Sequence, residues 1–121
     1  MPPDNREMAW LWDMLDAART AVAFTQDLRF EAFLEDRRTR NAVERNFEIL
    51  GEAARRISDK TRGEIEEIPW RSIIGLRNIV AHEYGEIRYE ILWNVCRENL
   101  PSLIRFLESM GVDSPPSAKD L

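Results

Sequence analysis

Apolar residues recur at intervals of three and four along most of this chain, and such spacing is typical of α-helices that bury one face. The first segment carries one such row, formed by Met8, Leu11, Leu15, Ala18 and Val22. A second row, from Trp10 to Phe24, runs beside it and should make this apolar face broad. The five glycines and six prolines fall mostly at ends and joints. The pattern therefore predicts an all-α fold.

Local signals indicate where the first helices begin. Asp4 and Glu7 form a capping-box pair at the start of the first helix. A short helix is expected over about 29–35, after a cap at Thr25 or Asp27.

The middle of the chain should contain two longer helices. The first covers about 43–57, where Gly51 would let a partner helix approach closely. The charged stretch 58–67 interrupts the apolar rhythm and is expected to be a loop. The second helix begins at Pro69, whose fixed φ and missing N–H suit the first helical position.

The last helix is expected over about 88–110. It should kink at Pro101, because proline removes a backbone hydrogen bond and clashes with the preceding turn. Four main amphipathic helices and a short one bury their apolar faces most simply as an antiparallel helical bundle. A chain of 121 residues suits one domain, here 1–111, and the polar, proline-rich 112–121 should be a flexible tail.

Composition argues against several classes of protein. The single cysteine cannot form an intramolecular disulfide, the start of the chain lacks a secretion signal, and no apolar run approaches the roughly 20 residues that span a bilayer. We therefore expect a cytoplasmic protein without membrane contact. The net charge of −5 argues against binding nucleic acid chiefly by counterion release. Basic clusters at 37–40 and 54–56 could be local exceptions or simply solvated helix faces.

The segment 70–84 holds the residues that most suggest chemistry. On a helical wheel at about 100° per residue, its apolar side chains occupy an arc of roughly 160°, and Arg77 falls in the middle of that arc. An arginine on a core-facing stripe is costly unless it is paired or opens into a cleft. Arg77 could be a buried ion-pair partner of Glu48 or Glu52, or it could serve a function.

Asn78 and His82 are four residues apart and share another face of the same helix. Arg71 and Gly75 lie on that face too. Arg77 and His82 are about 140° apart, so a loosened helix or a second subunit would be needed to bring them together.

The stretch EIPWRSIIGLRNIVAHEYGEI, preceded by FEILGEAARRIS and followed by WNVCRENLPSL, resembles the HepT toxins of the HEPN superfamily over roughly 30–107. The family motif is an arginine, a polar residue, three further positions, a histidine, one position and a tyrosine. The matching residues of this chain are Arg77, Asn78, His82 and Tyr84. The resemblance implies a HEPN-like bundle that is a metal-independent ribonuclease, with catalytic Arg77, Asn78 and His82 and no cofactor.

The same resemblance implies partners. The chain would be the toxin of a toxin–antitoxin pair and a homodimer with its RNA cleft between the subunits. Its antitoxin would be an MntA-like nucleotidyltransferase that adenylylates Tyr84, and the added group would block the site by size and charge.

The chemistry of these residues agrees with that account. His82, with a reference pKa near 6.5, can take the proton of a 2′-hydroxyl that attacks the adjacent phosphate. Arg77 can hold two phosphate oxygens, and Asn78 can orient the phosphate or the imidazole. A lone histidine and a lone cysteine give no recognisable set of metal ligands.

Two other functions remain open at this point. The bundle could be a non-catalytic, nucleotide-binding or regulatory subunit of a nucleotidyltransferase, which the acidic charge favours. It could also be a structural dimer in which Arg77 pairs across the interface. Taken singly, His82 could be a helix-end residue, Asn78 ordinary surface and Tyr84 a packed ring with a solvated hydroxyl.

Overall fold

The computed structural model describes residues 3–80, 88–112 and 115 of the chain. In chain order its elements are α1 (Asn5–Thr25), α2 (Phe30–Glu35), α3 (Arg37–Arg56), α4 (Asp59–Glu64), α5 (Trp70–Val80), α6 (Tyr89–Asn94), the π-helical segment η1 (Val95–Asn99) and α7 (Leu100–Ser109).

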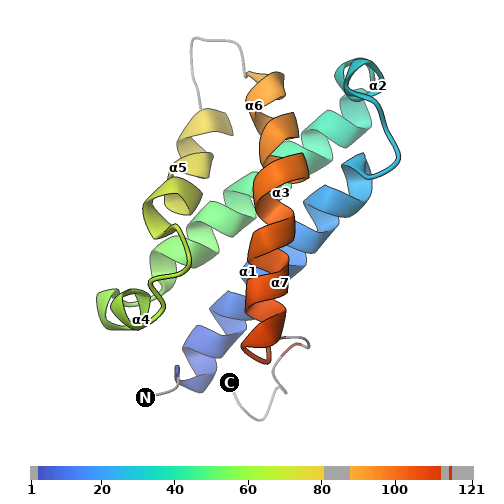
Figure 1. The fold of residues 1–121 in the computed structure, drawn as a ribbon. Coiled ribbons are helices and arrows are strands. Elements are labelled where there is room, and N and C mark those ends of the chain that lie inside the picture. The colour runs from blue at the N-terminus through green and yellow to red at the C-terminus, as the bar shows by residue number, and fades with distance from the viewer. Residues whose placement is uncertain (1–2, 81–87, 113–114, 116–121) are drawn as a thin grey trace.

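Successive long helices run in opposite directions along the bundle (Figure 1). The long α3 packs against α1 and against α5, while α7 packs against α1. The short α2 and α4 lie at opposite ends of α3 (Figure 1). The expected all-α antiparallel bundle is therefore confirmed. Of the helices in the described residues, none combines the length and the apolar character needed to cross a bilayer.

The apolar rows of the sequence form the core. Its largest fully buried side chains are Leu11, Met14, Leu15, Phe33, Val43, Phe47, Leu50, Ile57, Ile68, Leu92, Leu100 and Leu107. Phe24 is an exception, because its side chain is 48% exposed although it continues the second row of the first helix. The last turn of α1 is covered on one side, where Thr25 is buried, and Phe24 lies on the side that is left exposed.

The expected loop at 58–67 is wrong, because α4 forms within it. Ser58 caps this helix, and its hydroxyl oxygen accepts a hydrogen bond from the N–H of Thr61 at 3.1 Å. A helix of six residues has fewer than two turns, so an apolar period could not reveal it.

The cap of α2 also differs from expectation. The residue at the cap position is Arg29, which makes no side-chain capping bond, rather than Thr25 or Asp27. Thr25 belongs to the last turn of α1, where its hydroxyl donates to the carbonyl of Ala21 at 3.2 Å. Its side chain is therefore committed to the preceding helix.

The last helix is interrupted by η1 just before Pro101. The N–H of Leu100 donates to the carbonyl of Val95, five residues earlier, where an α-helix would use a residue four earlier. Pro101 has no N–H to offer and would crowd the carbonyl four positions back, so a wider turn accommodates it. The kink predicted at this proline stays a prediction, but the helix departs from regular α geometry there through a π turn.

The end of α7 is closed by a glycine in the left-handed region. Gly111 has φ 86°, and its N–H donates to the carbonyl of Glu108 at 3.0 Å. The N–H of Val112 donates to the carbonyl of Leu107 at 3.1 Å, which completes a Schellman motif. Val112 is buried and belongs to the folded part, whereas 113–114 and 116–121 of the expected tail lie outside the described residues.

The nearly buried carboxylate of Glu7 connects the start of α1 to the start of α4. Asp4 caps α1 by accepting from the N–H of Glu7 at 2.8 Å, but Glu7 itself turns toward α4. Its carboxylate accepts from the N–H of Ser58 at 2.7 Å and from the hydroxyl of Thr61. Burial alone would raise the pKa of Glu7, but the hydrogen bonds from Thr61 and Ser58 outweigh it and leave that pKa below its ordinary value.

Glu7→Gln should lower the free energy of unfolding by about 2 kcal/mol at pH 7, because it removes a charged acceptor from two buried donors. The folded pKa lies below the unfolded one. The contribution is therefore fully present above the unfolded pKa of about 4.3 and is lost as pH falls through the folded pKa. Urea unfolding at pH 7 and pH 3 should show a gap between variant and wild type that narrows in acid.

Glu66→Gln is the matched control, because Glu66 is exposed and makes no hydrogen bond or ion pair with a described residue. It should leave the unfolding free energy nearly unchanged at both pH values. A Glu7→Gln effect that is the same at pH 3 and pH 7 would contradict the role given to the ionised carboxylate.

Candidate functional site

The helix α5 carries the described part of the motif and is fixed at its start. Pro69 precedes it, and the carbonyl of Pro69 accepts from the N–H of Ile73 at 3.0 Å. The indole N–H of Trp70 donates to the carbonyl of Ile65 at 2.8 Å, which ties the first turn to the preceding segment. Ile73 and Leu76 are buried in the core. The helix thus begins one residue after the predicted start at Pro69, and its apolar stripe faces the core as predicted.

The helices α3 and α5 approach each other closely at Gly51. A Cβ placed there would lie 3.3 Å from the Cβ of Arg77, 3.3 Å from the carbonyl oxygen of Ile73 and 3.4 Å from the backbone nitrogen of Arg77. A side chain at this position would therefore press on the backbone of α5. This confirms that Gly51 admits a partner helix, and it shows that the root of Arg77 sits at the contact.

The guanidinium of Arg77 does not stay in the core. Its side chain is 52% exposed, and Nη1 donates to Oε2 of Glu52 on α3 at 3.2 Å. The ion pair with Glu52 is one of the expected alternatives, but the expectation that this pair is buried is wrong. A long side chain can leave its stem against apolar neighbours while its charged end reaches water, so an arginine rooted at a helix contact need not be buried.

Glu52 gathers three arginines around one carboxylate. Besides Arg77, it accepts from Nη2 of Arg55 at 2.9 Å and from Nε of Arg56 at 3.3 Å. The hydrogen bond from Arg55 is the main reason why the pKa of Glu52 lies below its ordinary value, and the charge of Arg77 adds to the effect. Glu52 therefore stays ionised beside Arg77. The basic cluster at 54–56 is largely explained by these pairs.

The two described motif residues point to different sides of α5. Asn78 is exposed, as is Arg71, and the two are about 20° apart on the wheel, whereas Arg77 is about 100° from Asn78. The structure therefore does not place Arg77 and Asn78 on the same side of α5. His82 and Tyr84 lie in 81–87, outside the described residues, so their predicted positions remain predictions.

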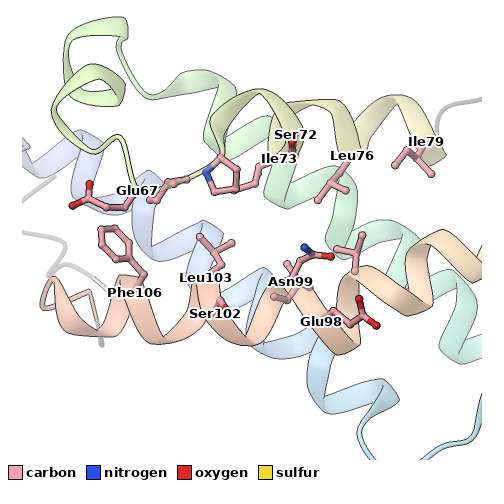
Figure 2. Close-up of a pocket in the computed structure, with 14 residues that line it drawn as sticks. Glu67, Ser72, Ile73, Leu76, Ile79, Glu98, Asn99, Ser102, Leu103 and Phe106 are labelled. Atoms are coloured by element: carbon pink, nitrogen blue, oxygen red, sulfur yellow. The ribbon is translucent and has the colours of Figure 1, made fainter.

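A groove of about 620 Å³ separates α5 from η1 and α7 (Figure 2). Its walls are mainly apolar, with Ile73, Leu76 and Leu103 among the lining side chains, and the carboxylates Glu67 and Glu98 lie toward opposite ends. The described lining includes no arginine, lysine or histidine. Because a phosphate needs cationic or N–H donors, this groove is not suited to hold one.

Other chemically capable groups can be assessed directly. Burial raises the pKa of the Cys96 thiol to about 12, so this cysteine stays protonated and is a poor nucleophile. In the part of the chain that the structure describes, no three acidic, histidine or cysteine side chains are grouped as metal ligands. Of the two ion-pair partners that the sequence offered for Arg77, Glu48 and Glu52, the structure selects Glu52. Glu48 instead pairs with Arg45 at 3.4 Å.

Comparison with known proteins gives consistent matches over most of the chain. The family profile described as "Ribonuclease HepT-like" matches residues 14–110. The Methanocaldococcus jannaschii protein named "Putative RNase MJ1380" is 37% identical over 100 residues, which cover 83% of this chain and 92% of that protein. The "Probable ribonuclease HepT" of Thermococcus cleftensis is 36% identical over 94 residues, covering 78% of this chain and 86% of that protein. Among solved structures there is no significant match.

Gly51→Ala should destabilise the fold by about 1 kcal/mol, because the strain of a methyl group against α5 outweighs the gain in helix propensity. Gly63→Ala is the matched control, since a Cβ on Gly63 would meet no atom within 4 Å. That variant should be neutral or slightly stabilising. Urea unfolding of both variants tests the packing, and equal effects at the two positions would show that the contact at Gly51 is not tight.

Proposed function

The chain belongs to the HepT-like ribonuclease family, and from this premise we propose that it is the toxin of a toxin–antitoxin pair that cleaves RNA without a metal ion. The proposed catalytic residues are Arg77, Asn78 and His82. The observation that carries the proposal is the placement of Arg77. This motif arginine is held at the surface by the carboxylate of Glu52 and is not buried in the core.

The pairing with Glu52 leaves most of the guanidinium available. Only Nη1 of Arg77 donates to Glu52, and its Nε and Nη2 make no hydrogen bond with a described residue. Those two nitrogens form one edge of the planar fork, which matches two oxygens of a phosphate. Glu52 would thus act as a positioning residue that fixes the direction of this edge.

In the proposed reaction His82 takes the proton of the 2′-hydroxyl, and the 2′-oxygen attacks the adjacent phosphorus. The bond from phosphorus to the 5′-oxygen breaks, and the leaving oxygen takes a proton from solvent. The products are a 2′,3′-cyclic phosphate and a free 5′-hydroxyl. Arg77 stabilises the charge that develops on the phosphate oxygens, and Asn78 orients the phosphate or the imidazole.

The divergence of Arg77 and Asn78 supports a site completed by more than α5. A homodimer would supply a second copy of each residue across one cleft, since a symmetric dimer presents the same surface twice. We therefore propose a homodimer as the active form.

Arg77→Ala and His82→Ala should each lower the rate of RNA cleavage by about a hundredfold or more, because each removes a group that acts in the transition state. Glu52→Ala should lower kcat by a smaller factor, about tenfold, because it frees Arg77 without removing it. Glu52→Gln, which keeps an oxygen acceptor, should recover part of that loss. The measurement is cleavage of a labelled single-stranded RNA by purified, unmodified protein.

Glu48→Ala is the control for Glu52→Ala, because Glu48 lies one turn earlier on α3 and pairs with Arg45 rather than with Arg77. It should cleave RNA at the wild-type rate. Equal cleavage by wild type, Arg77→Ala and His82→Ala would rule out the nuclease and favour the non-catalytic subunit of a nucleotidyltransferase, which the net charge of −5 also suits.

We further propose that an MntA-like nucleotidyltransferase antitoxin adenylylates Tyr84. The chain has two tyrosines, and the other one, Tyr89, is half-buried and donates its hydroxyl to Oε2 of Glu44 at 3.0 Å. Burial and the neighbouring Glu44 raise the pKa of Tyr89, which makes it a poor nucleophile and a suitable internal control.

Mass spectrometry after co-expression with the neighbouring nucleotidyltransferase should show one added adenosine monophosphate on wild type and on Tyr89→Phe, and none on Tyr84→Phe. The modified protein should lose RNA cleavage, because a bulky anion would occupy the phosphate site. Neutralisation of the wild type without any modification would contradict this mechanism.

A further inference from the structure

Gly75 occupies the middle of α5, where a glycine weakens a helix relative to alanine. Nothing in the described chain explains it, because a Cβ built on Gly75 would meet no atom within 4 Å. Gly51 gives the contrast, since its missing side chain is filled by the backbone of α5. The cost at Gly75 therefore has no packing return among the described residues, and the space beside it is open to a ligand.

The neighbours of Gly75 on the helix surface are polar. Arg71 lies four residues before it and Asn78 three residues after it, so the three share one face of α5. Arg71 and Asn78 are both exposed, and neither side chain makes a hydrogen bond or an ion pair with a described residue. This outer face of α5 is thus a narrow polar strip that has no side chain at its centre, where Gly75 lies.

The charge of α5 favours an anionic ligand. Its sequence, WRSIIGLRNIV, contains two arginines and no acidic residue, although the whole chain has a net charge of −5. The helices α1, α3 and α7 all contain carboxylates. Arg77 pairs with Glu52 on another side of the helix, but Arg71 has no carboxylate of α5 beside it, and its charge attracts an anion to the outer face.

We propose that the outer face of α5, formed by Arg71, Gly75 and Asn78, is the surface along which the sugar–phosphate backbone of the RNA lies. The inference rests on the ribonuclease function proposed above and adds two binding residues, Arg71 and Gly75, to the motif residue Asn78. Arg71 binds a phosphate, Asn78 donates to a phosphate or ribose oxygen, and Gly75 lets the backbone come against the helix. A second copy of the chain suits this face less well, because the cores of homodimer interfaces are mainly apolar and these three residues offer no large apolar side chain.

The test compares Gly75→Ala and Arg71→Gln with wild type. The probe is a fluorescein-labelled 2′-O-methyl oligonucleotide of mixed sequence, which lacks the attacking hydroxyl, and binding is measured by anisotropy at several salt concentrations. Arg71→Gln should weaken binding by about tenfold at low salt and lower the slope of log Kd against log salt by about 0.7. Gly75→Ala should weaken binding by about fivefold while raising Tm by about 2–6 °C.

Two variants away from this face are the controls. Gly63→Ala adds a methyl group in open space on α4, and Arg38→Gln removes an exposed arginine on α3 that makes no ion pair with a described residue. Both should bind the probe as wild type does. A Gly75→Ala protein that is more stable and yet binds poorly would separate the role in binding from any role in folding.

The outcomes distinguish this inference from the function on which it rests. If wild type cleaves RNA and both variants bind and cleave as it does, the inference is wrong and the ribonuclease stands. If Gly75→Ala dissociates a dimer in sedimentation analysis and keeps its affinity for the probe per chain, the face belongs to a second copy. If wild type neither binds the probe nor cleaves RNA, both proposals fall.

Discussion

The contact between α3 and α5 at Gly51 determines where the rest of the candidate site can be. The two helices approach until the position of a Cβ on Gly51 is 3.3 Å from the Cβ of Arg77, so the arginine begins inside the helix pair. Its side chain extends from there to the surface, where Nη1 donates to Glu52, the residue that follows Gly51 on α3. A packing constraint and an ion pair from neighbouring residues therefore act together to fix one charged group.

Much of the fold could be predicted because its signals are periodic and local. The rows of apolar residues identify the long helices, and Pro69 and Pro101 mark a start and an irregularity. The short α4 escaped prediction, because six residues are too few to display a period. Phe24 fits the period and is nevertheless exposed, because the spacing along one helix does not say how much of a broad apolar face the neighbouring helices cover.

The candidate site was less accessible to sequence reasoning for a related reason. A helical wheel gives the direction in which a side chain leaves the backbone, and for Arg77 that direction is toward the core. It does not give the end point of a side chain as long as that of arginine, which here reaches the surface. From the sequence, the ion-pair partner of Arg77 could be narrowed to Glu48 or Glu52, which lie one turn apart on the same face of α3. Only the register between the two helices decides between them.

The π turn in η1 has a consequence for how the last rod of the bundle is shared. One residue more than in a regular turn rotates everything before it by about 100° relative to everything after it. Two successive intervals of four, from Leu92 to Cys96 and from Cys96 to Leu100, would carry an apolar row off one face of a regular helix, and the extra residue of the π turn compensates for that drift. The buried side of the rod is therefore continuous, and along it α6 contacts α2 and α3 while α7 contacts α1.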